Sequence, residues 1–160
     1  MAEPYEEILE GETVLRSAPG ARHEKICSAL HAQLAASLAT IFSSRLLPPR
    51  SVIQLSPGTI IRPDLALVTT ANNRLWLAAE IINTEDHRMD TVLKKTIYED
   101  SNLARLWMID PRYDNIEVYH GGTYGLTLQH ILASKECLTE KLLPALSIAI
   151  TELFNAGQQA

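Results

Sequence analysis

The run Leu75-Trp76-Leu77-Ala78-Ala79 is apolar at every position and does not alternate with polar residues. A strand of this kind is buried on both faces, in the middle of a sheet that has other elements packed against each side. The chain has 160 residues, 46% of them hydrophobic. That is enough to build such a layered core, and it fits one domain spanning residues 1–160.

Helical patterns precede and follow this strand. Apolar residues recur every three or four positions over residues 23–42, without Gly or Pro, and again over residues 88–101. Residues 144–154 also show apolar residues at helix-like spacing, and we expect that segment to cap the core. The two tryptophans, Trp76 and Trp107, are expected to be core residues of central strands.

Short runs rich in β-branched residues, separated by turn residues, predict the remaining strands. These strands cover residues 12–17, 52–55, 59–61, 64–69, 75–82, 106–109 and 115–120, and Gly121-Gly122 is expected to turn the last into a hairpin partner at 123–129. The step from 75–82 through the second helix to 106–109 is typical of a right-handed parallel crossover. The order predicts an α/β fold, with a mixed sheet flanked by helices.

Charge and cysteine content exclude several classes of protein. The formal net charge of −5 argues against strong non-specific DNA binding, which needs clustered Lys and Arg, but it allows a local basic patch or a metal-assisted contact. Cys27 and Cys137 form neither a close metal pair nor a disulfide framework. We find no signal peptide and no stretch apolar enough to span a bilayer. A cytoplasmic protein without a membrane partner is expected.

One carboxylate is unusual in its setting. Glu80 lies at the end of the apolar strand, where burying a charge is costly unless it is paired or binds a metal. Asp64 begins the neighbouring predicted strand, so the two acids can meet. Two carboxylates, a backbone carbonyl and waters make an oxygen-rich site for a cation such as Mg²⁺. Lys94, on the following helix, could orient a water or stabilise phosphoryl charge.

Each of these three residues also has a plain structural explanation. Asp64 follows a proline and suits the start of a strand. Glu80 could form an ion pair across the sheet, and Lys94 lies four residues after Asp90, where an i, i+4 surface pair is possible. From spacing alone, both interpretations stay open.

Further motifs accompany these residues along nearly the whole chain. They are Gly11-Glu12, His23 at the start of the first helix, Arg62-Pro63-Asp64-Leu65-Ala66-Leu67-Val68, Leu77-Ala78-Ala79-Glu80-Ile81-Ile82, Asp90 with Lys94 and Tyr98, Leu106-Trp107-Met108-Ile109-Asp110-Pro111, Val118-Tyr119, Leu142-Leu143-Pro144-Ala145-Leu146 and Glu152-Leu153-Phe154. In order and spacing this set resembles the Uma-type family of restriction endonucleases, part of the PD-(D/E)XK nuclease superfamily.

The resemblance implies a restriction-endonuclease-like domain with a metal-dependent phosphodiesterase site. By position, Asp64 and Glu80 would be ligands of Mg²⁺ or Mn²⁺, with the Ile81 carbonyl as a third. The superfamily's lysine usually lies two residues after the acid, where this chain has Ile82. A lysine on the next helix replaces it in the Uma-type pattern, and Lys94 matches that position.

Other residues are weaker candidates. Glu12 is an accessory carboxylate or an exposed strand residue, His23 is a site neighbour or a structural histidine, and Tyr98 shares a helix face with Lys94. The chain also departs from the family's Ser-Pro-Ser-Thr-like loop, since it has Asn83-Thr84-Glu85-Asp86 after the glutamate strand. These acids repel a phosphate or are simply solvated. His87, beside them, is a weaker candidate still.

Two functions from different classes follow. The first is a metal-dependent endonuclease that hydrolyses DNA, expected as a homodimer because cutting both strands needs two sites or two binding events. The second is a non-catalytic module that keeps the nuclease fold to bind nucleic acid or protein. Other hydrolase classes lack support, because the chain has no Gly-x-Ser-x-Gly elbow and no Cys–His signature.

Overall fold

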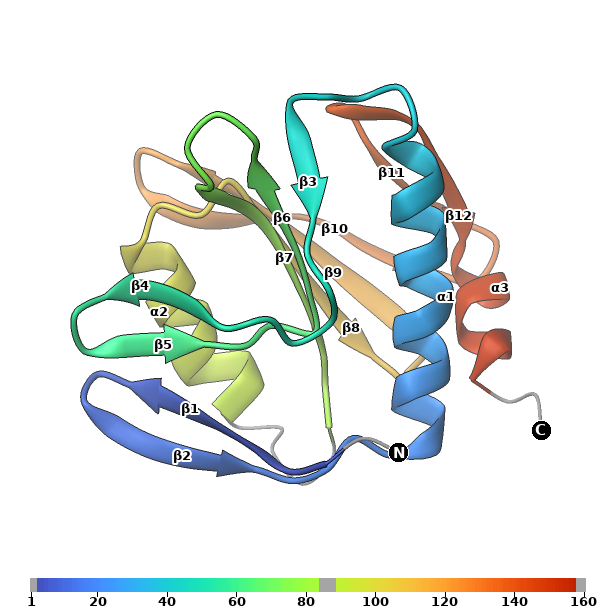
Figure 1. The fold of residues 1–160 in the computed structure, drawn as a ribbon. Helices are drawn as coiled ribbons and strands as arrows, with labels where there is room; N and C mark the ends of the chain where they lie inside the picture. Colours follow the sequence, from blue (N-terminus) through green and yellow to red (C-terminus); the bar gives the residue numbers. More distant parts are fainter. Residues whose placement is uncertain (1–2, 84–88, 158–160) are drawn as a thin grey trace.

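The computed structural model describes residues 3–83 and 89–157. In this part of the chain, three β-sheets pack with three α-helices (Figure 1). The largest sheet has six strands in the order β10-β9-β8-β7-β6-β3, and a four-stranded sheet has the order β2-β1-β5-β4. The predicted α/β fold, with a mixed sheet flanked by helices, is confirmed.

The elements follow one another along the chain as follows. They are β1 Tyr5–Leu9, β2 Glu12–Arg16, α1 Ala21–Ser37, β3 Ser44–Leu46, β4 Ile53–Ser56, β5 Thr59–Ile61, β6 Leu65–Thr69, β7 Leu75–Ile81, a π-helical turn Met89–Leu93, α2 Lys94–Asp100, β8 Arg105–Asp110, β9 Asn115–Gly122, β10 Gly125–Ala133, β11 Cys137–Glu140, β12 Leu143–Ala149 and α3 Ile150–Ala156.

The apolar strand β7 lies inside the large sheet, as its sequence predicts. It pairs antiparallel with β6 and parallel with β8. Leu65 of β6 is opposite Ala79 of β7. Asp64 directly precedes Leu65, and Glu80 directly follows Ala79, so this register brings the two acids to the same end of neighbouring strands.

Alternate side chains of the large sheet enter two separate cores. Leu65, Leu67 and Leu77 pack against α1 on one face, together with α3 and β12. Ala66, Val68 and Ala78 lie on the other face, where α2 and strands β1 and β5 cover them. Figure 1 shows α1 and α2 on opposite sides of this sheet. Glu80 therefore projects toward α2, since it shares the parity of Ala78.

The end of the chain differs from the prediction. Residues 144–154 were expected to form one helix, but β12 occupies Leu143–Ala149 and pairs with β11, and α3 covers only Ile150–Ala156. The buried residues Leu146, Ile148 and Ile150 are two apart, a period that fits a strand with one buried face. The helix-like pattern starts only after them.

The first helix and the hairpin also differ in their limits. Helix α1 ends at Ser37, earlier than the expected residue 42. Gly121 and Gly122 are the last residues of β9, so the turn to β10 lies at residues 123–124. Gly121 is needed for another reason, since a Cβ there would lie 2.0 Å from the Leu103 carbonyl oxygen. Among the described residues, no helix is long and apolar enough to cross a bilayer.

Candidate active site

Asp64 is fixed by three neighbours at the start of β6. Its Oδ2 accepts a hydrogen bond of 2.8 Å from the Ile81 amide, while Oδ1 lies 3.1 Å from an Arg50 nitrogen and 3.4 Å from His23 Nε2. Burial raises the pKa of the carboxyl, but the hydrogen bond and charge of His23, the Ile81 amide and the charge of Lys94 outweigh burial. The net pKa lies below its ordinary value, so Asp64 is a carboxylate at neutral pH.

His23 projects from the first turn of α1 toward the end of β7. Its Nε2 lies 3.1 Å from the Ile81 carbonyl oxygen, and its Nδ1 lies 3.7 Å from a Glu24 carboxylate oxygen. Burial lowers the pKa of the imidazole, but the hydrogen bond and charge of Asp64 raise it to a net value above 6.5. The sequence left His23 open between a site residue and a structural one, and the fold brings it into contact with Asp64.

Glu80 projects from β7 toward α2, and residues of that helix bind it. Lys94 Nζ lies 2.8 Å from Glu80 Oε1 and also contacts Oε2. The Tyr98 hydroxyl, one helical turn later, donates to Glu80 Oε2 at 3.3 Å. All three side chains are buried. The Tyr98 hydroxyl thus helps to orient Glu80, and burial, followed by the nearby Glu80 and Glu7 carboxylates, raises the pKa of Tyr98 well above its ordinary value.

Glu7 completes this group, and sequence reasoning missed it. Its Oε2 lies 2.8 Å from Lys94 Nζ and accepts a 2.7 Å hydrogen bond from the Arg62 amide, while its Oε1 lies 2.7 Å from Arg16 Nε. Lys94 therefore lies between two buried carboxylates. A signal was present in the alternation of Tyr5, Glu7 and Leu9, which places Glu7 on the same strand face as an apolar residue.

The predicted site residues fall into three groups: some line a common cavity, Lys94 and Tyr98 contact Glu80 without lining that cavity, and Glu12 lies apart. Asp64, Glu80, Ile81 and His23 line one small cavity with Tyr5 and Asn83. Glu12 is exposed at the start of β2 and does not line it. Of the atypical loop, residues 84–86 lie outside the described residues, as does His87.

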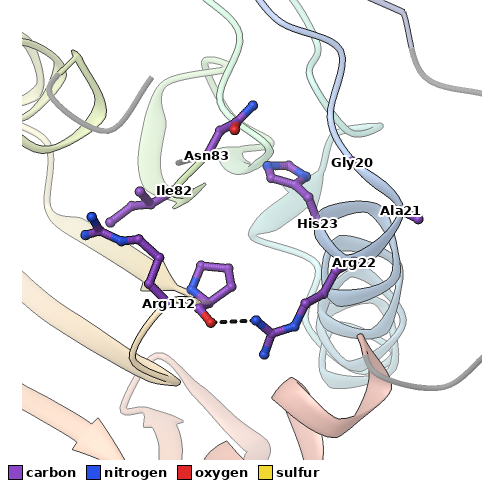
Figure 2. A pocket seen from close by; sticks show the side chains of 8 residues that line it. Gly20, Ala21, Arg22, His23, Ile82, Asn83 and Arg112 are labelled. Carbon is purple, nitrogen blue, oxygen red and sulfur yellow. Dashed lines mark hydrogen bonds between the residues drawn. The ribbon is translucent and has the colours of Figure 1, made fainter. Parts of the chain in front are cut away.

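A second, larger cavity adjoins the first at His23 and Asn83. It has a volume of about 340 Å³ and is also lined by the start of α1, by Ile82, and by Pro111 and Arg112. In Figure 2 the Arg22 side chain points away from His23 and donates to the Pro111 carbonyl, while Arg112 lies across the cavity from α1. The candidate site thus opens beside a space that carries two cationic side chains.

The donor atoms around His23 fit a divalent cation. In an octahedral shell with bonds of about 2.1 Å, neighbouring ligand atoms lie about 3.0 Å apart. His23 Nε2 is 3.1 Å from the Ile81 oxygen and 3.4 Å from Asp64 Oδ1, close to that spacing. In the described part of the chain, no three His, Cys, Asp or Glu side chains form a metal-ligand group. A cation here would therefore depend on the Ile81 carbonyl as well as on side chains.

Replacing Glu7 tests the buried network without touching the cation donors. Burial raises the pKa of Glu7, but Lys94 and Arg16 lower it to a net value below 4.5. A carboxyl with a depressed folded pKa stabilises the protein above its unfolded pKa, and this contribution is lost as the pH falls through the folded pKa. We expect Glu7→Gln to lower the free energy of unfolding at pH 7 by about 3 kcal/mol, since it breaks a buried ion pair.

The same variant should flatten the fall in melting temperature below about pH 4.5, because the titrating group is gone. Glu6→Gln is the matched control, since Glu6 is the adjacent residue and is exposed. It should change the melting temperature little and keep the acid profile of the wild type. Thermal melts at half-unit pH steps give both readouts, and parallel profiles for Glu7→Gln and wild type would contradict the assignment.

Known proteins share both the sequence pattern and the fold. The family model described as "Uma2: Putative restriction endonuclease" matches residues 2–151. In structure the chain is similar to a putative nuclease belonging to DUF820 from Anabaena variabilis, with a TM-score of 0.80 and 15% sequence identity, covering 97% of this chain and 92% of that chain. At this identity the likeness shows a common fold alone. No curated protein matches the sequence.

Proposed function

The chain belongs to the Uma2 family of putative restriction endonucleases, as its motif order predicts, and we propose that it is a cytoplasmic, metal-dependent endonuclease that hydrolyses DNA phosphodiester bonds. One observation carries the proposal. A carboxylate, an imidazole nitrogen and a backbone carbonyl converge from Asp64, His23 and Ile81, beside a glutamate that a buried lysine holds.

The ligand set favours Mn²⁺ or Mg²⁺. Asp64, Glu80 and the Ile81 carbonyl supply the oxygen atoms that both ions take. His23 adds a nitrogen, which Mg²⁺ rarely accepts, so Mn²⁺ is favoured between the two. Glu24 lies 3.7 Å from the other ring nitrogen, so its negative charge is close to the imidazole.

The remaining residues have distinct roles in this proposal. When bound, a divalent cation lowers the pKa of a water and neutralises charge on the phosphoryl group. Lys94 provides a second positive charge, held in place by Glu7 and Glu80, that stabilises charge developing on the phosphate. Tyr98 keeps the Glu80 carboxylate oriented. Asp64 is already ionised before a cation arrives.

DNA is the proposed substrate, although the net charge of −5 gives no general attraction to phosphates. Binding must then depend on local contacts. The cavity of about 340 Å³ beside His23 offers space for the nucleotide that flanks the scissile phosphate, with Arg112 at its edge. The Arg112 side chain is held toward this place by two hydrogen bonds to Asp110, of 3.0 and 2.8 Å.

A non-catalytic binding module is the second candidate, and one feature favours it. The acids of the site already have protein cations as partners, with Arg50 on Asp64 and Lys94 on Glu80. Such a site is electrostatically balanced without a metal. The two functions differ in whether phosphodiester bonds break.

A plasmid-nicking assay separates the two candidates. Supercoiled DNA is incubated with the protein and Mn²⁺ or Mg²⁺, with EDTA as the matched reaction. We expect nicked and linear products that depend on the cation. Retention of the plasmid on the protein in a gel-shift assay, with no strand breakage in either cation, would favour the binding module.

We further propose a homodimer, joined through the edge strand β10. The C-terminal segment is an unsuitable surface because its apolar residues, Leu146 and Phe154 among them, already enter the core of this chain. Strand β10 instead ends the large sheet and exposes Leu128 and Ile131. A free apolar edge of this kind favours pairing with a second copy.

Light scattering tests the dimer. We expect a mass of twice 17.7 kDa for the wild type and a shift to 17.7 kDa for Ile131→Lys. Leu142→Lys is the matched control, because Leu142 is also 53% exposed but lies outside β10. It should leave the mass unchanged. A wild-type mass of 17.7 kDa across a range of concentrations would rule the dimer out.

A further inference from the structure

Among the residues that the structure describes, Arg50 makes the closest cationic contact with Asp64. The residue lies in the segment between β3 and β4, and its side chain is 13% exposed. One guanidinium nitrogen lies 3.1 Å from Asp64 Oδ1, and the other lies 2.7 Å from Glu24 Oε1. Arg50 thus forms ion pairs with both Asp64, a candidate metal ligand, and Glu24, which lies near His23 Nδ1.

The backbone holds this side chain in place. Arg50 has a φ of +56°, in the left-handed region that non-glycine residues rarely adopt. Its amide is 3.2 Å from the carbonyl oxygens of both Pro63 and Asp64, and its carbonyl accepts a 2.8 Å hydrogen bond from the Arg62 guanidinium. A strained backbone tied directly to Asp64 indicates that the position of the guanidinium matters.

The contact uses the oxygen that a cation would need. Asp64 Oδ2 is engaged by the Ile81 amide, while Oδ1 faces His23 Nε2. A divalent cation between Asp64, His23 and Ile81 would therefore have to share Oδ1 with Arg50. Two like charges on one oxygen atom repel each other, and the repulsion is strong at a site shielded from water.

We propose that Arg50 is a built-in counter-ion that sets the affinity of the site for its divalent cation. It balances the Asp64 carboxylate before a cation binds, and it opposes binding by competing for Oδ1. Because Glu24 offers the guanidinium a second acceptor, Arg50 can release Asp64 and still keep one ion-pair partner. This inference rests on the proposed function, since it concerns the same metal site.

The test is calorimetric titration of the full-length protein with MnCl₂, without DNA. We expect Arg50→Gln to bind Mn²⁺ about tenfold more tightly than the wild type, since one opposing charge is gone. Its melting temperature without metal should fall, because Asp64 loses its counter-ion, and added Mn²⁺ should raise it by more than in the wild type. Arg50→Lys keeps the charge and should bind Mn²⁺ within about threefold of the wild type.

Arg22→Gln is the matched control. Arg22 lies on α1 beside His23, but its guanidinium contacts Asp114 and the Pro111 carbonyl. Its loss should change Mn²⁺ affinity less than about threefold. If Arg50→Gln folds too poorly for titration, Arg50→Met gives a second variant, since it keeps the bulk of the side chain without its charge and should also bind Mn²⁺ more tightly than the wild type.

The outcomes distinguish this inference from the proposed function. Wild-type binding of Mn²⁺ that is unchanged or weakened in Arg50→Gln overturns the role of Arg50 and leaves the metal site standing. Absence of Mn²⁺ binding in both proteins overturns both. Binding of Mn²⁺ by Arg50→Gln but not by the wild type would support the inference, since Arg50 would then prevent binding altogether.

Discussion

Asp64→Asn is expected to reduce metal-dependent DNA cleavage by about a thousandfold. The substitution keeps the shape of the side chain and removes the charge that a cation requires. Loss of one charged ligand costs several kcal/mol of transition-state stabilisation, and each 1.4 kcal/mol is about tenfold in rate. The variant should also lose the rise in melting temperature that millimolar Mn²⁺ gives the wild type, which reflects mass action on the folded state.

Glu12→Gln is the control for this variant. Glu12 is an acid of the N-terminal hairpin that the fold leaves exposed and outside the site cavity. The Glu12→Gln variant should cleave DNA at close to the wild-type rate and keep the rise in melting temperature that Mn²⁺ causes. Equal cleavage by wild type and Asp64→Asn, in the same preparation conditions, would point to a contaminant or to another site. A thousandfold loss of cleavage rate in Glu12→Gln would instead mean that Glu12 takes part in the reaction.

The placement of Asp64 and Glu80 could be predicted because it follows from sheet geometry. An uninterrupted apolar strand lies in the centre of a sheet. An acid at the end of such a strand, like Glu80, is then adjacent to the residue at the start of the antiparallel neighbour, which is Asp64. Lys94 and Tyr98 are four residues apart and so share a helix face. These inferences need only the periods of strands and helices.

Glu7 and Arg50 could not be found in this way. Glu6 and Glu7 are adjacent acids, and the ion pairs of Glu7 with Lys94 and Arg16 arise only when β1 packs in the fold. Arg50 follows two prolines in a segment without regular structure, and its left-handed backbone is set by contacts with residues 62–64. Both residues act through partners distant in sequence, and although the alternation in β1 indicates which face Glu7 occupies, no local pattern reveals those partners. The residues 144–154 were misread for a related reason, since strand and helix periods overlap over a few apolar positions.

Lys94→Met is the second variant with a large expected effect, and it affects both stability and activity. The lysine is 1% exposed and is shared by Glu7 and Glu80. Methionine fills a similar volume but leaves two buried carboxylates without their common cation. We expect the free energy of unfolding to fall by about 3–5 kcal/mol, the cost of breaking a buried pair from one side. Urea melts at pH 7 measure it.

The neighbouring Lys95 provides a matched control. Its ammonium lies 4.7 Å from the centre of the Tyr119 ring, a contact expected to contribute at most about 1 kcal/mol. Lys95→Met should therefore unfold close to the wild type and cleave DNA normally. The contrast between adjacent lysines on one helix separates the buried ion pair from the general loss of a positive charge.

A double variant distinguishes the structural role of Lys94 from its chemical one. The double variant Lys94→Met with Glu7→Gln has only one of the two carboxylates that lost Lys94. Its free energy of unfolding should therefore lie above the value that the sum of the two single-variant losses gives, so the effects should not add. Cleavage should stay about a hundredfold or more below the wild type, because no ammonium remains to stabilise charge on the phosphate. Recovery of cleavage along with stability would mean that Lys94 only balances buried charge, and the proposed chemical role would then be wrong.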